Sequence, residues 1–310
     1  MKSFKSVPAI ICLIFFNTAI NAQWVQSKIT GMHNGDVSCL SVCGKNTLAG
    51  TWGDGIFLST DDGSNWRQVN SGFNDIDINA LGVSGTNVIA ATNGGLFFSR
   101  DKGETWAKAN GITNSFVKSV AVSGKIFYTG TFGGGVFRST DGGENWTSLN
   151  SDAMNGWVFS LAASGSTVFA GTREGVYVSK DNGSKWSQIN LGIPDTKISA
   201  LYIDGKNIFI GLHGSLLISS NNGSSWMRVT SGLSELDINA IFADGTFILI
   251  GTNRGVLSSK DKGLSWTGIN AGLPETNICS LEVSGKTTLA GTWGLGIWRK
   301  VSSNLSTMQN

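Results

Sequence analysis

The segment STDGGENW, residues 139–146, combines residue types that enzymes and carbohydrate-binding proteins use. Asp141 could serve as a general acid or base or accept hydrogen bonds from a ligand, and an indole such as Trp146 can stack on a sugar ring. The glycines would let a ligand approach the backbone closely. The segment therefore raises a choice between a catalytic or binding site and a structural turn.

The same octapeptide pattern recurs six times, which favours the structural interpretation. The copies are STDDGSNW (59–66), SRDKGETW (99–106), STDGGENW (139–146), SKDNGSKW (179–186), SSNNGSSW (219–226) and SKDKGLSW (259–266). A catalytic group is needed once, and Asn221 replaces the carboxylate in the fifth copy. We therefore expect each side chain to accept hydrogen bonds within its own tight turn, with the tryptophan covering that turn. The predicted structural residues are Asp61, Asp101, Asp141, Asp181, Asp261, Trp66, Trp106, Trp146, Trp186, Trp226 and Trp266.

Each period of about 40 residues contains short apolar runs separated by turn residues. In residues 158–190 the runs are VFSLAA, TVFAGT, VYVS and KWSQIN, with Gly, Ser, Asn and Asp between them. Such runs are typical of strands joined by hairpins, and four strands per period match one propeller blade. Seven first strands can be counted, so the sequence predicts an all-β protein with a single seven-bladed β-propeller of four-stranded antiparallel blades.

The seventh blade ends after its third strand, GIWRK (296–300), and its fourth strand is expected from the other end of the chain. The segment QWVQSKITGM (23–32) resembles the fourth strands of the other blades, with Trp24 in the place of their tryptophan. The N-terminal strand should therefore pair with the last blade and close the ring, since an open ring would leave a free sheet edge. Residues 23–300 form the predicted propeller, residues 23–35 supply the outer strand of blade 7, and residues 301–310 form a polar tail.

At these residues the chain resembles the Asp-box, or BNR, repeat propellers. That superfamily includes sialidases, two-propeller xyloglucanases, sortilin-type receptors and photosystem II assembly factors. The resemblance implies the fold across about 275 residues, but it does not select an activity, because these families differ in chemistry.

The first 22 residues are typical of a secretory signal peptide. Lys2 and Lys5 precede the apolar run AIICLIFF (9–16), and the small residue Ala22 ends the segment. The run is too short to cross a bilayer, so we expect an exported protein without membrane insertion, in the periplasm or outside the cell. Without Lys2 and Lys5, 21 of the 23 basic residues remain against 21 acidic ones, and this balance argues against a nucleic-acid partner.

Binding residues are expected at the channel mouth, where the loops between second and third strands meet the residues that precede each first strand. Three of these loops are one residue longer and carry an aromatic side chain, namely Trp52, Phe132 and Trp293, and the first also carries the candidate ligand-binding residue Asp54. Such rings could stack on a sugar or a partner's side chain, or they could cap the groove between blades.

The residues before the first strands form a second ring at the mouth, which we expect to be uneven. One arc is acidic and polar and the other is aromatic and basic; around the circle the residues are Asp237, Asn277, Asp36, Asp77, Phe116, Trp157 and Lys197. This ring could form a pocket for a hydroxyl-rich ligand or a cation, or it could be the solvated rim of a water-filled channel.

Cysteines and histidines give no support to a metal site or a cofactor. The histidines, His33 and His213, are far apart in the sequence, and no CxxC spacing occurs. Cys39 and Cys279 lie on first strands of adjacent blades and could form a disulfide across the seam, or both could remain buried free thiols.

Three functions remain open from the sequence. The favoured one is a non-catalytic binding module, expected to be monomeric, that recognises a glycan, a peptide or a partner protein. A glycoside hydrolase would need two carboxylates about 5–9.5 Å apart, for which Asp36, Asp54, Asp77 and Asp237 are candidates. The resemblance to sialidases implies an arginine triad and a Tyr–Glu pair, but here the arginines are scattered and the three tyrosines fall within strands. The resemblance to xyloglucanases implies a cleft between two propellers, and this chain has one. The third is a structural or assembly-factor-like role, for which Arg173, Lys197 and Arg254 would form only a thin basic patch.

Overall fold

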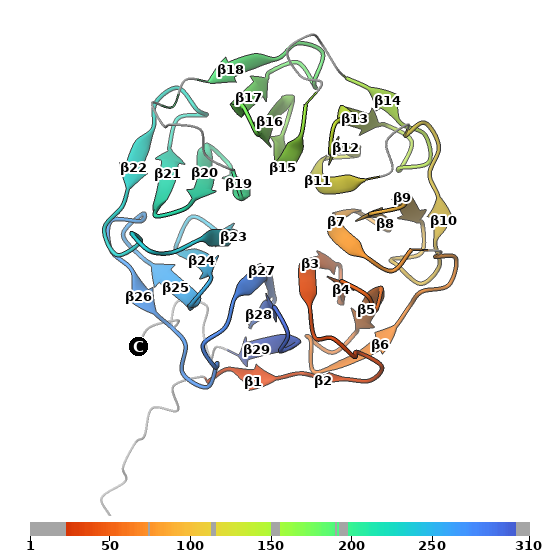
Figure 1. Cartoon of the computed structure of the whole chain (residues 1–310), viewed down its shortest axis with the longest axis horizontal. Helices are drawn as coiled ribbons and strands as arrows, with labels where there is room; N and C mark the ends of the chain where they lie inside the picture. Colours follow the sequence, from red (N-terminus) through yellow and green to blue (C-terminus); the bar gives the residue numbers. More distant parts are fainter. Residues whose placement is uncertain are drawn as a thin grey trace, which may run out of the picture.

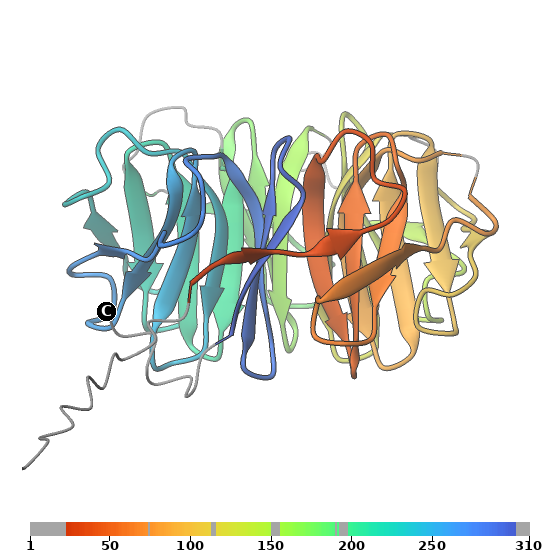
Figure 2. The same cartoon turned by 90° about the horizontal axis from the view of Figure 1, so that it is seen from below.

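The structure is a computed structural model that describes residues 23–73, 75–112, 116–149, 156–189, 191 and 198–301. These residues form seven sheets arranged around a central axis, as Figure 1 shows. Seen from the side in Figure 2, the sheets form a flat disc, and no helix occurs among the described residues. The predicted all-β fold with seven four-stranded antiparallel blades is confirmed.

The four strands of each blade follow one another in order from the axis to the rim. The first strands are β3 (Val37–Cys43), β7 (Ile78–Ser84), β11 (Val117–Ser123), β15 (Val158–Ser164), β19 (Ala200–Asp204), β23 (Ile238–Ala243) and β27 (Ile278–Ser284). The second strands are β4 (Asn46–Thr51), β8 (Asn87–Thr92), β12 (Ile126–Thr131), β16 (Thr167–Thr172), β20 (Asn207–Leu212), β24 (Ile248–Thr252) and β28 (Thr287–Thr292). The third strands are β5 (Ile56–Ser59), β9 (Gly95–Ser99), β13 (Gly135–Ser139), β17 (Gly175–Ser179), β21 (Ser215–Ser219), β25 (Gly255–Ser259) and β29 (Ile297–Val301). The outer strands are β6 (Asn65–Gln68), β10 (Ala107–Lys108), β14 (Thr147–Ser148), β18 (Ser187–Ile189), β22 (Met227–Val229) and β26 (Thr267–Gly268).

The N-terminal segment closes the ring. Strand β1 (Val25–Gln26) pairs antiparallel with β29, which confirms the expected pairing with the last blade. The next strand, β2 (Lys28–Ile29), pairs parallel with β6 of blade 1. Figure 2 shows this segment crossing from blade 7 to blade 1. The segment therefore joins both sides of the seam, and the addition to blade 1 was not expected from the repeat.

Trp24 anchors this closure. Its side chain is 2% exposed, and its Nε1 donates to the carbonyl oxygen of Ile269 at 2.7 Å. It packs in one cluster with Leu249 of blade 6 and Ala290 of blade 7. The closure thus depends on a buried side chain as well as on backbone pairing.

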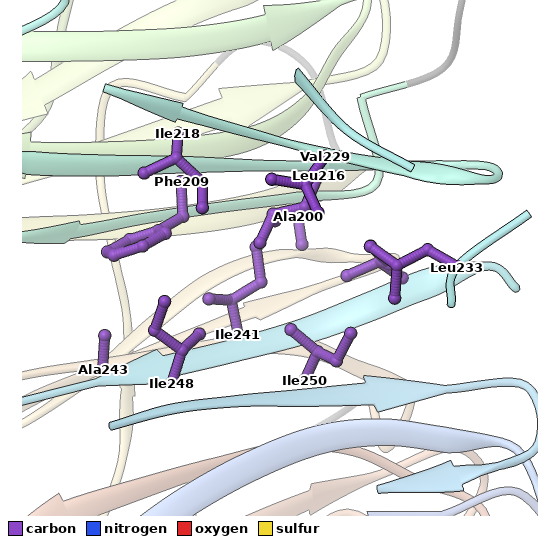
Figure 3. Packing of buried hydrophobic residues seen from close by; sticks show 11 residues of the cluster. Ala200, Phe209, Leu216, Ile218, Val229, Leu233, Ile241, Ala243, Ile248 and Ile250 are labelled. Carbon is purple, nitrogen blue, oxygen red and sulfur yellow. The ribbon is translucent and has the colours of Figure 1, made fainter. Parts of the chain in front are cut away.

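The apolar core lies between neighbouring blades. Figure 3 shows one such cluster, in which residues of blade 5 meet residues of blade 6. A small residue in the second strand allows this close approach: a Cβ atom on Gly50 would lie 2.5 Å from the Cγ2 atom of Ile78, the first residue of the next blade's inner strand. At the seam between blades 7 and 1, Gly291 contacts Val37 in the same way. Blade 1 therefore packs on blade 7 as the other blades pack on their neighbours.

The six octapeptides form the turns between third and outer strands. In blade 3, Asp141 Oδ1 accepts from the backbone N–H of Asn145 at 3.1 Å and from Ser139 Oγ at 2.9 Å. Its Oδ2 accepts from Asn145 Nδ2 at 2.8 Å, and Gly143 N donates to Ser139 Oγ. Asn221 uses its amide oxygen in the same way, accepting from Ser225 N at 2.9 Å. The carboxylates are therefore engaged within their own turns.

The octapeptide turns lie at the ends of the third strands, on the same side of the disc as the hairpins between first and second strands. We call this side the turn face. The Ser265 hydroxyl, together with backbone and Ser259 donors, lowers the pKa of Asp261 to about 2. The octapeptide carboxylates consequently stay ionised and accept hydrogen bonds at neutral pH, on the side opposite to the channel mouth.

Candidate functional site at the channel mouth

The predicted mouth residues lie side by side at one end of the channel. Trp52 N donates to the carbonyl oxygen of Asp36, and Trp293 N donates to that of Asn277, each at 3.0 Å. Phe132 N donates in the same way to Phe116. The loops between second and third strands thus meet the residues that precede the first strands. We call this side the mouth face.

A cavity of about 510 Å³ lies on the axis beneath the mouth face, and a ring of bulged residues lines it. In blade 1, Val37 pairs with Thr51 and Cys39 with Gly50, so Ser38 is an extra residue in the inner strand. The same irregularity occurs in blades 2, 3, 4, 6 and 7. The residues at this position are Ser38, Asn79, Lys118, Phe159, Ser199, Asn239 and Cys279, and all seven line the cavity.

The sequence prediction missed this ring because it relied on simple alternation. The residue before each bulged position is always Val or Ile, and the residue after it is always Cys, Ala or Ser. The bulged position alone varies in chemistry. That variation between two uniform positions was the available signal.

Several members of the bulge ring tie one blade to the next. Asn79 Nδ2 donates to the carbonyl oxygen of Val117 at 2.9 Å, and Asn239 Nδ2 donates to that of Ile278 at 3.3 Å. Ser38 Oγ donates to the carbonyl oxygen of Ile78. These contacts hold the wall of the cavity in place, because each crosses a blade boundary.

Two tryptophans stand together at one side of the cavity. The rings of Trp52 and Trp293 meet edge to face, with centroids 5.0 Å apart and an interplanar angle of 80°. Both line the cavity, and Trp293 is 51% exposed. The buried indole Nε1 of Trp52 has no hydrogen-bond acceptor among the described residues. The pair therefore presents an apolar surface to the cavity.

Lys118 brings a positive charge to the same place. Its Nζ lies 5.5 Å from the centroid of the Trp52 ring, a cation–π distance. Among the described residues that line the cavity, Lys118 is the one cation and Asp36 is the one carboxylate. The cavity thus combines an ammonium group with indole rings.

A second aromatic group lies on blades 3 and 4. Phe132 stacks between Phe116, at 4.7 Å between centroids, and Trp157, at 5.3 Å. Phe159 meets Phe132 edge to face, and it is the member of this group that lines the cavity. Trp157 is 46% exposed, with the Arg173 guanidinium 5.5 Å from its ring centroid. The expected aromatic arc therefore exists, but mostly outside the cavity.

The expected acidic arc is divided. Asp36 lines the cavity, whereas Asp77 and Asp237 do not. Asp77 accepts from Asn93 Nδ2 at 3.2 Å, and Asp237 pairs with His213 Nδ1 at 2.7 Å. These two carboxylates are thus engaged with neighbours on the rim.

Asp54 lies away from the cavity. It is 6% exposed and accepts from His33 N at 2.8 Å and Asn34 N at 3.2 Å, and it also pairs with His33 Nδ1. Burial alone would raise the pKa of Asp54, but these hydrogen bonds hold the pKa below its usual value. Asp54 therefore fastens the segment that follows β2, and it is not brought to the cavity. Lys197 lies outside the described residues.

Cys39 and Cys279 both line the cavity but are not bonded to each other. Together with Cys43 they are free cysteines. A Cβ atom on Gly50 would lie 2.5 Å from Cys39 Sγ and from Ile78 Cγ2, so the sulfur lies between its own second strand and blade 2, away from blade 7. Burial raises the pKa of both thiols to about 11, which makes them poor nucleophiles at neutral pH.

The described residues contain no cluster of potential metal ligands and no long apolar helix. No group of three or more His, Cys, Asp and Glu side chains is placed to hold a metal ion there. No helix in that part of the chain is long and apolar enough to cross a membrane.

Solved structures that superpose on the chain include an extracellular domain, YCF48 and a xyloglucanase. No protein-family model matches the chain, and no curated protein sequence matches it. The extracellular domain of BT4673 from B. thetaiotaomicron superposes with a TM-score of 0.73 at 16% identity, over 90% of this chain and 39% of that one. YCF48 from Cyanidioschyzon merolae gives 0.72 at 16% identity, over 90% of this chain and 98% of that one. The GH74 xyloglucanase from Xanthomonas campestris gives 0.70 at 16% identity, over 90% and 53%.

The similarity shows a shared seven-bladed propeller fold. At such identities it does not carry a function from one protein to another. The chain spans about two fifths of the BT4673 domain and about half of the xyloglucanase. A YCF48 structure bound to D1 peptide also superposes, with a TM-score of 0.74 at 13% identity. The fold thus occurs both in a protein solved with a bound peptide and in a xyloglucanase.

Proposed function

We propose that this protein is a non-catalytic binding propeller that holds a peptide segment of a partner protein at the channel mouth. The observation that carries the proposal is the grouping of Lys118, Trp52 and Trp293 at one cavity of about 510 Å³. An acidic group of the peptide would face Lys118 beside the Trp52 ring, and an adjacent apolar side chain would pack on the exposed Trp293 ring. The peptide-bound YCF48 structure supports the use of this fold for such a ligand.

The hydrolase alternative has weaker support. Glycoside hydrolysis needs a pair of carboxylates across the scissile bond, whereas Asp36 is the single carboxylate among the described cavity-lining residues. Asp77 and Asp237 are engaged on the rim, and Asp54 is buried elsewhere.

A glycan remains the second candidate ligand, because Trp157 and Trp293 expose their rings on the mouth face. The peptide is favoured since the Lys118 ammonium stands beside the Trp52 ring at the cavity. We also propose that residues 1–22 are a signal peptide that directs export. Extracellular domains among the similar structures support that location.

The test is selection of ligands from a displayed random-peptide library, followed by calorimetry with the enriched peptide. We expect acidic and apolar residues to be enriched, and Lys118→Met to weaken binding by about tenfold or more. Lys125→Met is the matched control, since Lys125 lies on the turn face in the hairpin that follows β11. Equal binding by wild type and Lys118→Met would refute this mode of recognition. Specific glycan binding on an array would favour the second candidate, and sustained glycoside hydrolysis would overturn the non-catalytic assignment.

A further inference from the structure

A second cavity, of about 460 Å³, opens on the turn face between blades 5 and 6. Blade 5 contributes Phe209, Ile218 and the hairpin that contains Asp204. Blade 6 contributes the loop after β23 and two lysines of its octapeptide turn, Lys260 and Lys262. This cavity lies at the opposite end of the disc from the mouth and shares no lining residue with the axial cavity.

At the junction between blades 3 and 4, two polar side chains fill the equivalent space. Tyr128 and Arg138 are paired neighbours on β12 and β13. Tyr128 Oη donates to Asn182 Oδ1 at 3.3 Å, and Arg138 Nη1 donates to the carbonyl oxygen of Asn182 at 3.0 Å. Asn182 is the fourth residue of blade 4's octapeptide and has a positive φ of 57°. Two long polar side chains therefore join blade 3 to the next turn.

Apolar residues replace both of these side chains between blades 5 and 6. Phe209 and Ile218 are the equivalent paired neighbours on β20 and β21. The turn residue equivalent to Asn182 is Lys262, with φ of 62°. Phenyl and sec-butyl groups can form no hydrogen bond to this turn, and Ile218 is shorter than an arginine. The cavity at this junction therefore has an apolar base.

The hairpin of blade 6 forms another wall of the cavity. Its last strand pair is Ala243 with Ile248, which leaves a four-residue loop, whereas blade 3 closes with Ser123 paired to Ile126. Asp244 Oδ1 organises this loop by accepting from Thr246 N at 2.9 Å and Phe247 N at 3.2 Å. Phe247 is buried as a result and adds its ring to the cavity wall.

The base of the cavity is apolar, and two lysines stand at its rim. Phe209, Ile218, Phe247 and Ile248 are all buried, and Figure 3 shows Phe209 and Ile218 facing Ala243 and Ile248 at one end of the cluster between these blades. Lys260 and Lys262 are exposed at the rim, opposed by one lining carboxylate, that of Asp204. Met227 also lines the cavity with an unbranched side chain that can adapt to a bound group.

We propose that this cavity binds a small amphipathic anion, an alkyl carboxylate whose tail enters between blades 5 and 6 while its carboxylate faces Lys260 and Lys262. The apolar base would gain from burial of the tail. The two ammonium groups select a negative head group over a neutral or cationic one. The volume lies within the range of small-molecule sites. This site is independent of the peptide site at the mouth.

The test is calorimetric titration of the folded protein with decanoate below its micellar concentration. We expect one saturable site, and we expect Lys260→Gln and Lys262→Gln each to weaken binding by about two- to fivefold, as for exposed ion pairs. The matched controls are Lys180→Gln and Lys102→Gln, which remove the lysines at the same two octapeptide positions in blades 4 and 2. Decylammonium is expected to bind more weakly than decanoate.

A second variant reproduces the closed junction of blades 3 and 4 by the changes Phe209→Tyr, Ile218→Arg and Lys262→Asn. It is expected to abolish decanoate binding, whereas Lys118→Met at the mouth should leave it unchanged. Absence of saturable binding in wild type would overturn the proposal. Equal losses in the control lysine variants, or full binding by the closed-junction variant, would also overturn it. If the triple variant does not fold, the paired lysine variants still decide the outcome.

Discussion

Lys118 Nζ lies 5.5 Å from the centre of the Trp52 ring, although the two residues belong to blades 3 and 1 with blade 2 between them. The contact reaches across the mouth of the channel, and it joins a residue of the bulge ring to a loop residue. It places the cation of the cavity beside the indole pair, which is the arrangement that the proposed peptide site requires.

The first prediction concerns this contact. Trp52→Ala should weaken binding of the selected peptide by about tenfold, since it removes the ring beneath Lys118. Trp52→Phe should lose less, because it keeps a ring. Calorimetry at low and high salt should show affinity falling with ionic strength in wild type and a flatter dependence in Lys118→Met. Unchanged affinity in Trp52→Ala would place the peptide elsewhere.

The second prediction tests the structural role of the octapeptide carboxylates. Asp141→Ala should lower the free energy of unfolding by about 1–2 kcal/mol, because it leaves the backbone N–H of Asn145 without its acceptor. Asp141→Asn should cost less, since Asn221 already fulfils this role in blade 5. Urea unfolding measures both values. Peptide binding at the mouth should not change, and loss of binding without loss of stability would point to a functional carboxylate.

The third prediction concerns Glu282 on β27, whose pKa burial raises to about 7. The folded state then holds this proton over a pH range in which the unfolded chain, with a usual glutamate pKa of 4.5, has released it. The contribution of Glu282 to stability should therefore fall as pH rises from about 4.5 to about 7, by about 1–3 kcal/mol, and should change little above that range.

Glu282→Gln is the control for this effect, since it stays neutral throughout. The difference in unfolding free energy between the variant and wild type should grow in favour of the variant from pH 4.5 to pH 7.5. A difference that is constant with pH would show that Glu282 titrates normally in the folded protein.

The fourth prediction concerns closure of the ring. Trp24→Ala should destabilise the protein by about 3–5 kcal/mol, the usual cost of truncating a buried tryptophan. Val25→Ala is the matched control, because Val25 lies on the same short segment and is exposed, and it should stay within about 0.5 kcal/mol of wild type. Thermal unfolding compares the two. Similar midpoints would mean that the backbone pairing of β1 with β29 holds the seam without Trp24.

The sequence was sufficient to predict the fold because its local signals repeat with a fixed period. The octapeptide pattern of residues 139–146 recurs in six blades and marks a turn in each of them. Its spacing gives the register of the strands around it. The missing outer strand of blade 7 and the match of residues 23–32 to the other outer strands were enough to predict how the ring closes. A rigid scaffold built from such local units needs little long-range information.

The candidate site could be predicted only in part. Trp52, Trp293 and Asp36 do line the cavity, and Phe132 and Trp157 do lie on the mouth face. Asp54, however, was expected among the mouth loops, and His33 and Asn34 draw it into a buried contact instead. Lys118 and Phe159 were missed because a bulge changes the direction of side chains by one residue, and alternation cannot reveal it.

From the sequence alone came the number of blades, the role expected for the repeated turns and the segment that closes the ring. Only the tertiary structure decided which side chains meet. Lys118 reaches Trp52 across blade 2, and Phe209 with Ile218 leaves open a space that Tyr128 with Arg138 fills. The physical reason is range: a turn is stabilised by residues within a few positions of one another, whereas a cavity depends on the packing of side chains brought together from separate blades.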